Sequence, residues 1–385
     1  MTTTGKKPVR VLHIVGGMVH GGIETWLMHV LRHTDRAQFQ MDFLVHTTTP
    51  CPYDDEVRAL GGRIIPCTDP ARLWSYARNF RRILRECGPY DIVHSHVHHF
   101  SGVTLRLAHA AGVPVRIAHS HVGVMPEDTA PGLLRRGYLK LMHRWISRYA
   151  TVGFAASRQA AAALFGADWE SDTRWKVLYY GIDLAPFHAG ADRSVRAEVG
   201  LPDDAFVVGH VGRFEEQKNH RFLLEIARGI VNLEPRTFLL LIGAGSLRPE
   251  IERRVTELGL ASHVIFAGLR ADVPRVLCSA VGCLVMPSLC EGLGLAVVEA
   301  QAAGVPSVLA DTIPPEADVV PSLVTRVRLS DPPAVWAKAV LATRDRPQPV
   351  APNQALALVE ASPFNIRQGV GELERRYLAV VNART

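Results

Sequence analysis

Short runs rich in β-branched residues alternate with helix-length amphipathic segments along almost the whole chain. This alternation is typical of parallel α/β sheets, in which a helix returns the chain from each strand to the next. Strands are expected in two series, at 9–15, 42–46, 92–96, 115–119, 152–155 and 176–179, and then at 205–212, 237–242, 263–266, 283–286 and 307–310. The sequence therefore predicts an α/β protein with two Rossmann-like, parallel-sheet domains.

The stretch 181–202 separates the two series and is the expected linker, because it is rich in Pro, Gly, Ala and charge and lacks periodicity. We expect an N-terminal domain over 1–185 and a C-terminal domain over 186–365. An irregular, Pro-rich segment at 346–363 precedes a last helix, and residues 366–385 are expected to pack back on the first domain. Ligands of open parallel sheets bind beyond the carboxyl ends of the strands. Two such domains facing across a cleft would therefore place their strand-end loops around a ligand.

The net charge of +6 lies in the first half, where residues 1–190 hold 22 Lys and Arg against 15 Asp and Glu. A basic excess suits nucleic acid, an anionic membrane or a phosphorylated substrate. No nucleic acid is expected, because aromatic interleaving and a recognisable module are lacking. Six cysteines without C-x-x-C spacing predict neither a disulfide framework nor a zinc site. No apolar run approaches the ~18 residues of a membrane span, so we expect a cytoplasmic protein.

The sequence PSLCEGLGLAVVEAQAAGVPSV at 287–308 predicts a strand end, a glycine loop and a helix. Glu291 lies in the loop and Glu299 in the helix, and paired carboxylates can accept hydrogen bonds from the vicinal diols of a ribose or hexose. Gly292 and Gly294 allow the backbone to approach a ligand, and the free N–H groups at a helix start can bind sugar hydroxyls or phosphate. The segment therefore predicts a sugar site, with a plain strand-to-helix turn as the alternative.

Two further loops carry groups suited to phosphate. In VGRFEEQKNH at 211–220, Arg213 and Lys218 stand beside a helix whose expected N-cap is Asn219. Two cations at a helix N-terminus make a pyrophosphate site, although such residues are also common as solvated loop ends. In HGGIETW at 20–26, Gly21 and Gly22 follow the first strand, and the lack of G-x-G-x-x-G argues against a dehydrogenase.

Histidines gather at two strand ends, in HSHVHHF at 94–100 and RIAHSH at 116–121. Both segments are expected to line the cleft. No carboxylate or cysteine is interleaved with them, so no metal site is expected.

Together these motifs resemble glycosyltransferase family 4, whose E-x7-E signature matches Glu291 and Glu299. Leu293 stands where the family usually has Phe, which leaves the backbone amides of Gly292, Leu293 and Gly294 intact. The resemblance implies that Glu299 holds the donor ribose and Glu291 the donor sugar near its 3- and 4-hydroxyls.

The family also carries an Arg and a Lys on the donor diphosphate, which match Arg213 and Lys218. Its Gly-Gly-x-Glu element, matched by Gly21 and Gly22, brings backbone amides over the donor phosphates. The histidine segments and DTIPPEADVV at 311–320 resemble the exopolysaccharide-assembling branch.

That branch resemblance implies that His119 contacts the donor sugar, while His94 and His96 are acceptor-side or packed. Tyr180, where the family often has Asn, is a departure that leaves the domain-junction contact open.

The resemblance implies a GT-B fold and a retaining, metal-independent hexosyltransferase of polysaccharide biosynthesis. The donor, a UDP-sugar or a GDP-sugar, is a substrate, and no cofactor is expected. The expected acceptor is a saccharide or lipid-linked saccharide. A nucleotide-sugar epimerase of the same architecture and a nucleotide-sugar-binding protein without turnover are the alternatives.

The segment 133–149 is expected to form an amphipathic helix with apolar residues on one face and Arg136, Lys140, Arg144 and Arg148 beside it. The apolar residues are Leu134, Tyr138, Leu141, Trp145 and Tyr149. This composition fits an interfacial helix that attaches the protein peripherally to the inner membrane face. A core-packed helix with a basic solvent face fits it equally.

Overall fold

The computed structural model describes residues 7–123, 128, 130–345 and 349–383. The chain divides into two compact units, which we call unit 1 (Met1–Gly181 with Ile366–Thr385) and unit 2 (Ile182–Asn365). The chain leaves unit 1 after Gly181 and returns to it at Ile366, whereas the sequence placed the domain boundaries after 185 and 365. Within the described ranges, no helix combines the length and the apolar character needed to cross a membrane.

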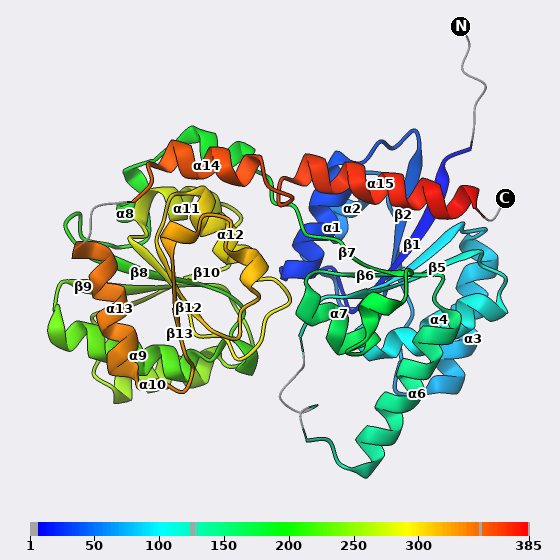
Figure 1. Cartoon of the computed structure of the whole chain (residues 1–385), viewed down its shortest axis with the longest axis horizontal. Helices are drawn as coiled ribbons and strands as arrows, with labels where there is room; N and C mark the ends of the chain where they lie inside the picture. Colours follow the sequence, from blue (N-terminus) through cyan, green and yellow to red (C-terminus); the bar gives the residue numbers. More distant parts are fainter. Residues whose placement is uncertain (1–6, 124–127, 129, 346–348, 384–385) are drawn as a thin grey trace, which may run out of the picture. The chain divides into compact units, whose positions relative to one another are not determined.

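Unit 1 contains a seven-stranded parallel sheet with the strand order β3-β2-β1-β4-β5-β6-β7 (Figure 1). Its strands are β1 (Val9–Val15), β2 (Phe39–Val45), β3 (Ile64–Pro66), β4 (Ile92–Ser95), β5 (Val115–Ser120), β6 (Val152–Ala155) and β7 (Trp175–Val177). Its helices are α1 (Gly22–His33), α2 (Asp54–Ala59), α3 (Leu73–Cys87), α4 (Ser101–Ala110), α6 (Leu133–Tyr149), α7 (Arg158–Phe165) and α15 (Ile366–Asn382).

The two faces of this sheet differ in chemistry, because successive side chains on a strand point to opposite faces. One face carries Leu12 and Ile14 of β1 into a large apolar core with residues of α3, α4, α6 and α7. The other face carries His13 of β1, and α1 and α15 contact each other and supply Trp26 and Tyr377 to the aromatic packing there. The C-terminal helix is therefore part of the core of unit 1.

Helix α6 confirms the predicted segment but divides into two parts. Met142 and Ile146 of its second half are buried. In its first turn, Leu133 and Leu134 are 85% and 93% exposed. Core packing therefore accounts for the second half of the helix, and its first turn presents apolar side chains to solvent.

Unit 2 contains a six-stranded parallel sheet with the order β10-β9-β8-β11-β12-β13 (Figure 1). Its strands are β8 (Phe206–Val211), β9 (Thr237–Ile242), β10 (Val264–Gly268), β11 (Cys283–Met286), β12 (Ser307–Ala310) and β13 (Val324–Val327). Its helices are α8 (Ser194–Glu198), α9 (His220–Leu233), α10 (Arg248–Glu257), α11 (Val273–Ala280), α12 (Leu295–Ala302), α13 (Pro333–Asp345) and α14 (Pro352–Glu360).

Two sequence expectations about unit 2 are wrong. The segment 346–363 is not irregular throughout, because it contains α14, which begins with a proline and buries Leu356 and Val359. Proline at the first helical position is favourable, since that N–H has no partner within the helix. Residues 346–348 of this segment lie outside the described residues.

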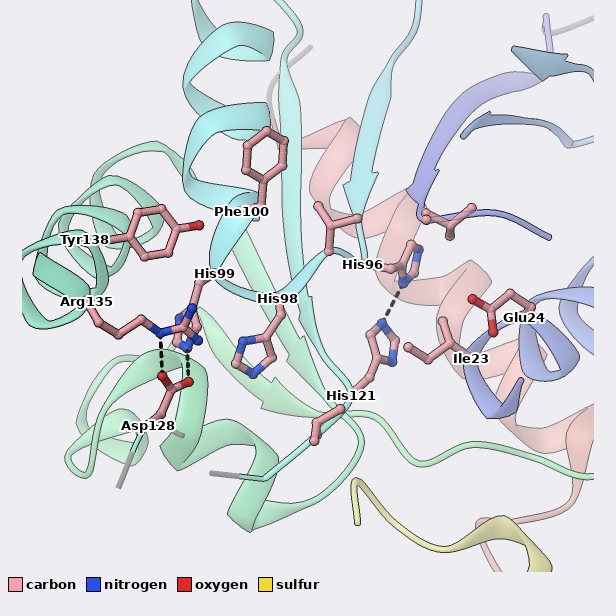
Figure 2. Close-up of a pocket in the computed structure, with 14 residues that line it drawn as sticks. Ile23, Glu24, His96, His98, His99, Phe100, His121, Asp128, Arg135 and Tyr138 are labelled. Carbon is pink, nitrogen blue, oxygen red and sulfur yellow. Dashed lines mark hydrogen bonds and ion pairs between the residues drawn. The ribbon is translucent and has the colours of Figure 1, made fainter. Parts of the chain in front are cut away.

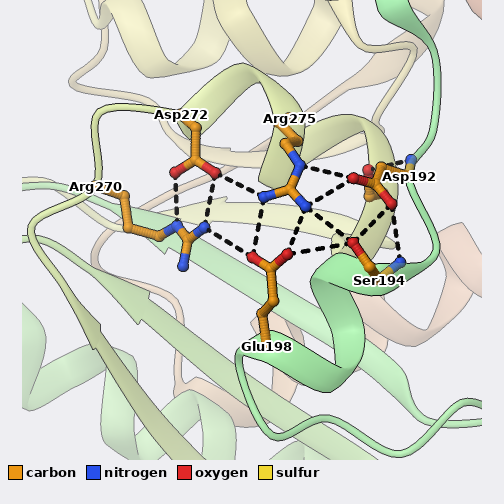
Figure 3. Close-up of polar contacts among 7 residues, drawn as sticks. Asp192, Ser194, Glu198, Arg270, Asp272 and Arg275 are labelled. Atoms are coloured by element: carbon orange, nitrogen blue, oxygen red, sulfur yellow. Dashed lines mark hydrogen bonds and ion pairs between the residues drawn. The ribbon is translucent and has the colours of Figure 1, made fainter.

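The expected linker 181–202 is also folded, since it contains α8 and a short 3-10 helix. Arg275 of α11 binds Asp192 at 2.7 Å and Glu198 at 2.6 Å, and so joins this segment to the body of unit 2 (Figure 3). A sequence without periodicity is thus held by ion pairs and by scattered buried apolar side chains, such as Phe187 and Val195.

Candidate functional site

In unit 2, the predicted sugar loop connects β11 to α12. Gly294 has a φ of +90° as the residue that precedes α12, and this left-handed conformation favours glycine. Leu293 is buried, so the residue that replaces the family's Phe packs into the unit. Gly292 and the Glu291 side chain are buried as well. The loop therefore has a fixed path before the amide groups at the start of α12.

The loop after β8 lies against the sugar loop, because β8 and β11 are neighbours in the sheet. Gln217 donates from Nε2 to the carbonyl of Cys290 at 2.8 Å, and Asn219 donates from Nδ2 to the carbonyl of Pro287 at 3.1 Å. Asn219 precedes α9 as predicted, but its side chain does not cap the helix. It joins the two loops instead, from a left-handed backbone conformation with a φ of 55°.

These contacts bring two of the predicted site residues together. Lys218 donates from Nζ to Glu291 Oε1 at 2.6 Å, and the two side chains are only 16% and 7% exposed. A cation and a carboxylate that stand so close and so far from water hold each other strongly. Arg213, at the end of β8, is exposed to solvent. The structure thus assembles Lys218 and Glu291 as an ion pair, with Arg213 on the same loop.

Glu299 lies in α12 and has a different environment. Burial raises the pKa of its carboxyl to about 7, although part of the residue is exposed to solvent. The charged form of a carboxylate is disfavoured where little water reaches it. Near neutral pH the side chain therefore exists in both protonation states, and either can hydrogen-bond a hydroxyl.

In unit 1, the predicted glycines mark the start of α1. Gly21 precedes the helix and Gly22 is its first residue. A Cβ on Gly21 would lie 2.4 Å from a carboxylate oxygen of Glu24, whereas a Cβ on Gly22 would meet no atom within 4 Å. Glycine at position 21 thus lets the Glu24 carboxylate fold back over the helix start.

Five histidines lie together on one face of the unit 1 sheet, namely His13 in β1, His94 and His96 at the end of β4, and His119 and His121 at the end of β5. The parallel register pairs His13 with His94, and residues two apart on a strand share a face. All five side chains are buried. We call these residues the histidine layer.

One hydrogen-bonded chain in the layer leads to a pocket. His13 Nδ1 lies 2.9 Å from His96 Nε2. His96 Nδ1 lies 2.7 Å from His121 Nε2, and Figure 2 shows this second bond. Burial lowers the pKa of His13 to about 3 and those of His96 and His121 well below the usual range. These imidazoles are therefore neutral at physiological pH.

A second chain leads to the C-terminal helix. Tyr377 Oη lies 2.6 Å from His94 Nδ1, and His94 Nε2 lies 3.1 Å from His119 Nδ1. Burial lowers the pKa values of both histidines well below the usual range and raises that of Tyr377 well above it. His119 is fully buried among aromatic rings, which include Trp26.

Two overlapping triads of the layer could hold a metal ion, His13 with His94 and His96, and His96 with His119 and His121. Neutral imidazoles suit zinc, copper and nickel. The nitrogens that face each other are nevertheless 2.7–3.1 Å apart, which is hydrogen-bond spacing. A proton shared between them accounts for this geometry.

A pocket with a volume of about 450 Å³, which we call the pocket of unit 1, is lined by His96 and by His121, the residue that ends the first chain (Figure 2). Glu24 of α1, Tyr138 of α6 and an ion pair between Arg135 and Asp128 at 2.8 Å also line it. Carboxylates, imidazoles and a phenol beside apolar walls can bind a molecule with several hydroxyl groups.

Sequence reasoning singled out His119, but His119 does not line this pocket, whereas His121 does. His121 belongs to the RIAHSH segment, so the signal was present two residues away. The i, i+2 spacing shows that His119 and His121 share a face, but not which of them reaches the surface.

Comparisons with known proteins agree with this architecture. The family of glycosyl transferases group 1 matches residues 192–342, and the glycosyl transferase 4-like domain matches residues 21–181. EpsF of Bacillus subtilis (strain 168), named as a glycosyltransferase, is 36% identical over 375 residues, which are 96% of each chain. The UDP-Gal:alpha-D-GlcNAc-diphosphoundecaprenol alpha-1,3-galactosyltransferase of Escherichia coli is 27% identical over 331 residues, which are 81% of each chain.

Among solved structures, HepE of Anabaena in complex with UDP and glucose is similar over 96% of this chain and 100% of its own, with a TM-score of 0.80. Its sequence identity is 19%, so this likeness concerns the fold. The two parallel-sheet units and this neighbour confirm the predicted GT-B fold class. From the matched families, the 36% identity to EpsF and the motif-bearing loops of both units, we conclude that the chain is a glycosyltransferase of the family 4 type, in its exopolysaccharide branch.

Proposed function

We propose that this glycosyltransferase moves a hexosyl group from a nucleotide diphospho-sugar to a hydroxyl acceptor with retention of the anomeric configuration. The observation that carries the proposal is the pairing of Lys218 with Glu291 on adjoining loops beside the start of α12. A cation for a phosphate and a carboxylate for a sugar hydroxyl then stand next to each other. A nucleotide diphospho-sugar carries both groups on adjacent parts of the molecule.

For the donor, we assign the diphosphate to Arg213 and Lys218, since two cations favour a dianionic group. The sugar hydroxyls fall to Glu291, and the ribose hydroxyls to Glu299. The amides of Gly292, Leu293 and Gly294 and those of Gly21 and Gly22 are further donors to the sugar and the phosphates. His119 is assigned to the donor sugar by the family resemblance. The complexes of HepE with UDP and with UDP-glucose support a UDP-sugar, with a GDP-sugar as the other candidate.

The proposed mechanism is front-side transfer, in which the leaving diphosphate and the incoming hydroxyl occupy the same face of an oxocarbenium-like centre. Such a reaction needs no enzymic nucleophile. The diphosphate gains negative charge as the glycosidic bond breaks, and the cations of Arg213 and Lys218 stabilise that charge. Fixed cations near a developing charge are among the largest contributions to catalysis, so no divalent metal ion is required in this scheme.

For the acceptor, we propose a lipid-linked saccharide of extracellular polysaccharide assembly, with its sugar in the pocket of unit 1. The name of the Escherichia coli relative, which includes a diphosphoundecaprenol acceptor, supports this choice. Helix α6 supports it too, because Tyr138 and Arg135 line the pocket while the neighbouring Leu133 and Leu134 are exposed. We further propose that the exposed leucines and the basic residues of α6 attach the protein peripherally to an anionic membrane face.

The test is a transfer assay with purified protein, UDP- and GDP-sugars and a lipid-linked saccharide. Thermal unfolding with each nucleotide and nucleotide sugar selects the donor first, because ligands that bind the folded state stabilise it. Product should form only with the acceptor, with the anomeric configuration of the donor. Nucleotide release without any acceptor would indicate an epimerase, and binding without turnover under all conditions would indicate a binding protein.

A further inference from the structure

Tyr377 is the residue of the C-terminal helix that contacts the histidine layer. Its side chain is fully buried, and its hydroxyl has one hydrogen-bond partner among the described residues, His94 Nδ1 at 2.6 Å. His94 continues through Nε2 to His119 Nδ1 at 3.1 Å, with the two rings stacked at 5° and 5.1 Å between centroids. A phenol that lies 283 residues from His94 in the sequence thus begins a chain that ends at His119.

The protons of this chain have only two possible arrangements. Burial keeps the phenol protonated and both imidazoles neutral, so each imidazole carries one N–H and one lone pair. In the first arrangement, the phenol donates to His94 and His94 donates to His119. In the second, His119 donates to His94 and His94 donates to the phenol.

Buried polar groups decide between them. In the first arrangement, the one donor without a partner is the N–H at His119 Nε2, a buried atom with no partner among the described residues. In the second arrangement, the phenol O–H has no acceptor and His119 Nε2 has no donor. Since each unpaired buried group carries a desolvation penalty, the first arrangement is favoured.

We infer that Tyr377 is a positioning residue that fixes the tautomer of His119. Its hydroxyl donates to His94 Nδ1, His94 donates from Nε2 to His119 Nδ1, and His119 consequently carries its proton on Nε2. The N–H at Nε2 is then a donor of fixed position, and a sugar hydroxyl can accept from it once ligand binding makes this buried atom accessible. This last step rests on the proposed function, which assigns His119 to the donor sugar, while the tautomer itself does not.

The other chain of the layer shows why the phenol matters. It runs from His13 through His96 to His121, and it ends in the unpartnered atoms His13 Nε2 and His121 Nδ1. This chain has an imidazole at each end. Whether its protons are donated from His13 toward His121 or from His121 toward His13, one terminal N–H and one terminal lone pair remain unpaired. Only the chain that begins at Tyr377 has a preferred direction.

The first experiment measures the tautomer in the wild-type protein. Protein labelled with ¹⁵N-histidine gives long-range ¹H–¹⁵N correlations that distinguish a protonated ring nitrogen from an unprotonated one, and the signals of His119 are assigned by their loss in His119→Gln. We expect a protonated Nε2 and an unprotonated Nδ1. A proton on Nδ1 of His119 would overturn the inference.

The second experiment removes the phenol hydroxyl in Tyr377→Phe. The matched control is Tyr76→Phe, because Tyr76 is equally buried and its Oη lies 3.0 Å from Nε2 of His46, which is outside the layer. We expect His119 to become a mixture of tautomers in Tyr377→Phe and to keep one tautomer in Tyr76→Phe. An unchanged tautomer in a folded Tyr377→Phe variant would overturn the inference. If that variant does not fold, the position of the His119 proton in the wild-type spectrum tests the inference by itself.

Turnover separates this inference from the proposed function. Loss of the group that holds a catalytic imidazole in its tautomer can lower kcat by orders of magnitude, so kcat/KM of Tyr377→Phe should fall by at least about 10-fold. The Tyr76→Phe control should keep its activity. If the tautomer of His119 is lost and turnover does not change, the positioning role of Tyr377 stands and the assignment of His119 to the donor sugar is wrong.

Discussion

Replacing Glu291 by Gln removes the charge that holds Lys218 in the ligand-free protein. In the wild-type chain the two side chains are bonded at 2.6 Å and are 16% and 7% exposed. A diphosphate that binds Lys218 must therefore compete with Glu291 for the same ammonium group. The amide oxygen of Gln still accepts a hydrogen bond, but a neutral acceptor binds about half as strongly as a charged one.

The magnitude follows from that competition. A hydrogen bond to a charged group contributes about 1.5–3 kcal/mol, so halving it in Glu291→Gln should release about 1 kcal/mol for the binding of UDP or GDP. The Kd of the nucleoside diphosphate should fall by about fivefold. The nucleotide sugar should behave in the opposite way, because the carboxylate that we assign to its hydroxyls is lost. Its kcat/KM should fall by roughly 10–100-fold.

Calorimetric titration of the nucleoside diphosphate and steady-state transfer kinetics measure the two effects. The control is Glu216→Gln, which removes an equal charge on the same turn as Lys218 but breaks an exposed pair with Arg221. Because exposed pairs are screened and weak, its Kd should stay within about twofold of the wild type. An unchanged or higher Kd for the diphosphate in Glu291→Gln would refute the competition between Glu291 and the donor for Lys218.

Raising the pH from 4.5 to 7 should destabilise the protein by up to about 3 kcal/mol through Glu299 alone, because burial raises the pKa of Glu299 to about 7 and the folded state keeps a proton that the unfolded state releases. The free energies of unfolding of the wild type and Glu299→Gln, measured by urea titration, should therefore diverge between pH 4.5 and 7. The same pH dependence in both proteins would contradict the raised pKa of Glu299. Turnover should survive EDTA, whereas replacing Arg213 or Lys218 by Ala should lower the turnover rate by on the order of 10²–10³. If EDTA abolishes the activity and Mn²⁺ or Mg²⁺ restores it, the mechanism depends on a metal ion. Replacing the α6 residues Arg136, Lys140, Arg144 and Arg148 by Gln should reduce sedimentation with anionic vesicles, as should added salt, and equal binding to neutral vesicles would remove the electrostatic explanation.

The central strands could be predicted from the sequence because they are apolar runs that end at turn residues. The bounds expected for 152–155, 237–242, 283–286 and 307–310 match β6, β9, β11 and β12. The edge strands β3 and β13 are not predicted, since both are partly exposed, β3 ends in Pro66 and β13 carries the polar Thr325 and Arg326. Short edge strands carry little periodicity, and neighbouring strands determine their pairing.

Predictions of irregular structure were less successful, for a related reason. Proline and polar residues predict loops at 346–363 and 181–202, but α14 begins with a proline, and ion pairs together with the buried Val195 hold α8. Both features depend on partners distant in sequence. Local composition alone does not specify them.

For the site of unit 2, the sequence predicts which residues take part, but it does not predict how they are arranged in space. The sequence identifies Lys218 and Glu291, and their bond requires β8 and β11 to be neighbours in the sheet. In unit 1, alternation predicts that His119 and His121 share a face. Nothing near them in the sequence indicates that Tyr377 completes the chain through His94.

The return of the chain to unit 1 at Ile366 has a consequence for synthesis on the ribosome. Unit 2 is continuous in sequence, whereas unit 1 needs its last helix, which includes the buried Tyr377. Domains generally fold as units during translation. Every segment of the core of unit 2 is therefore synthesised before α15, although unit 1 began first. A released chain that is truncated before Ile366 should bury the core of unit 2 and leave the histidine layer open on the side that α15 covers.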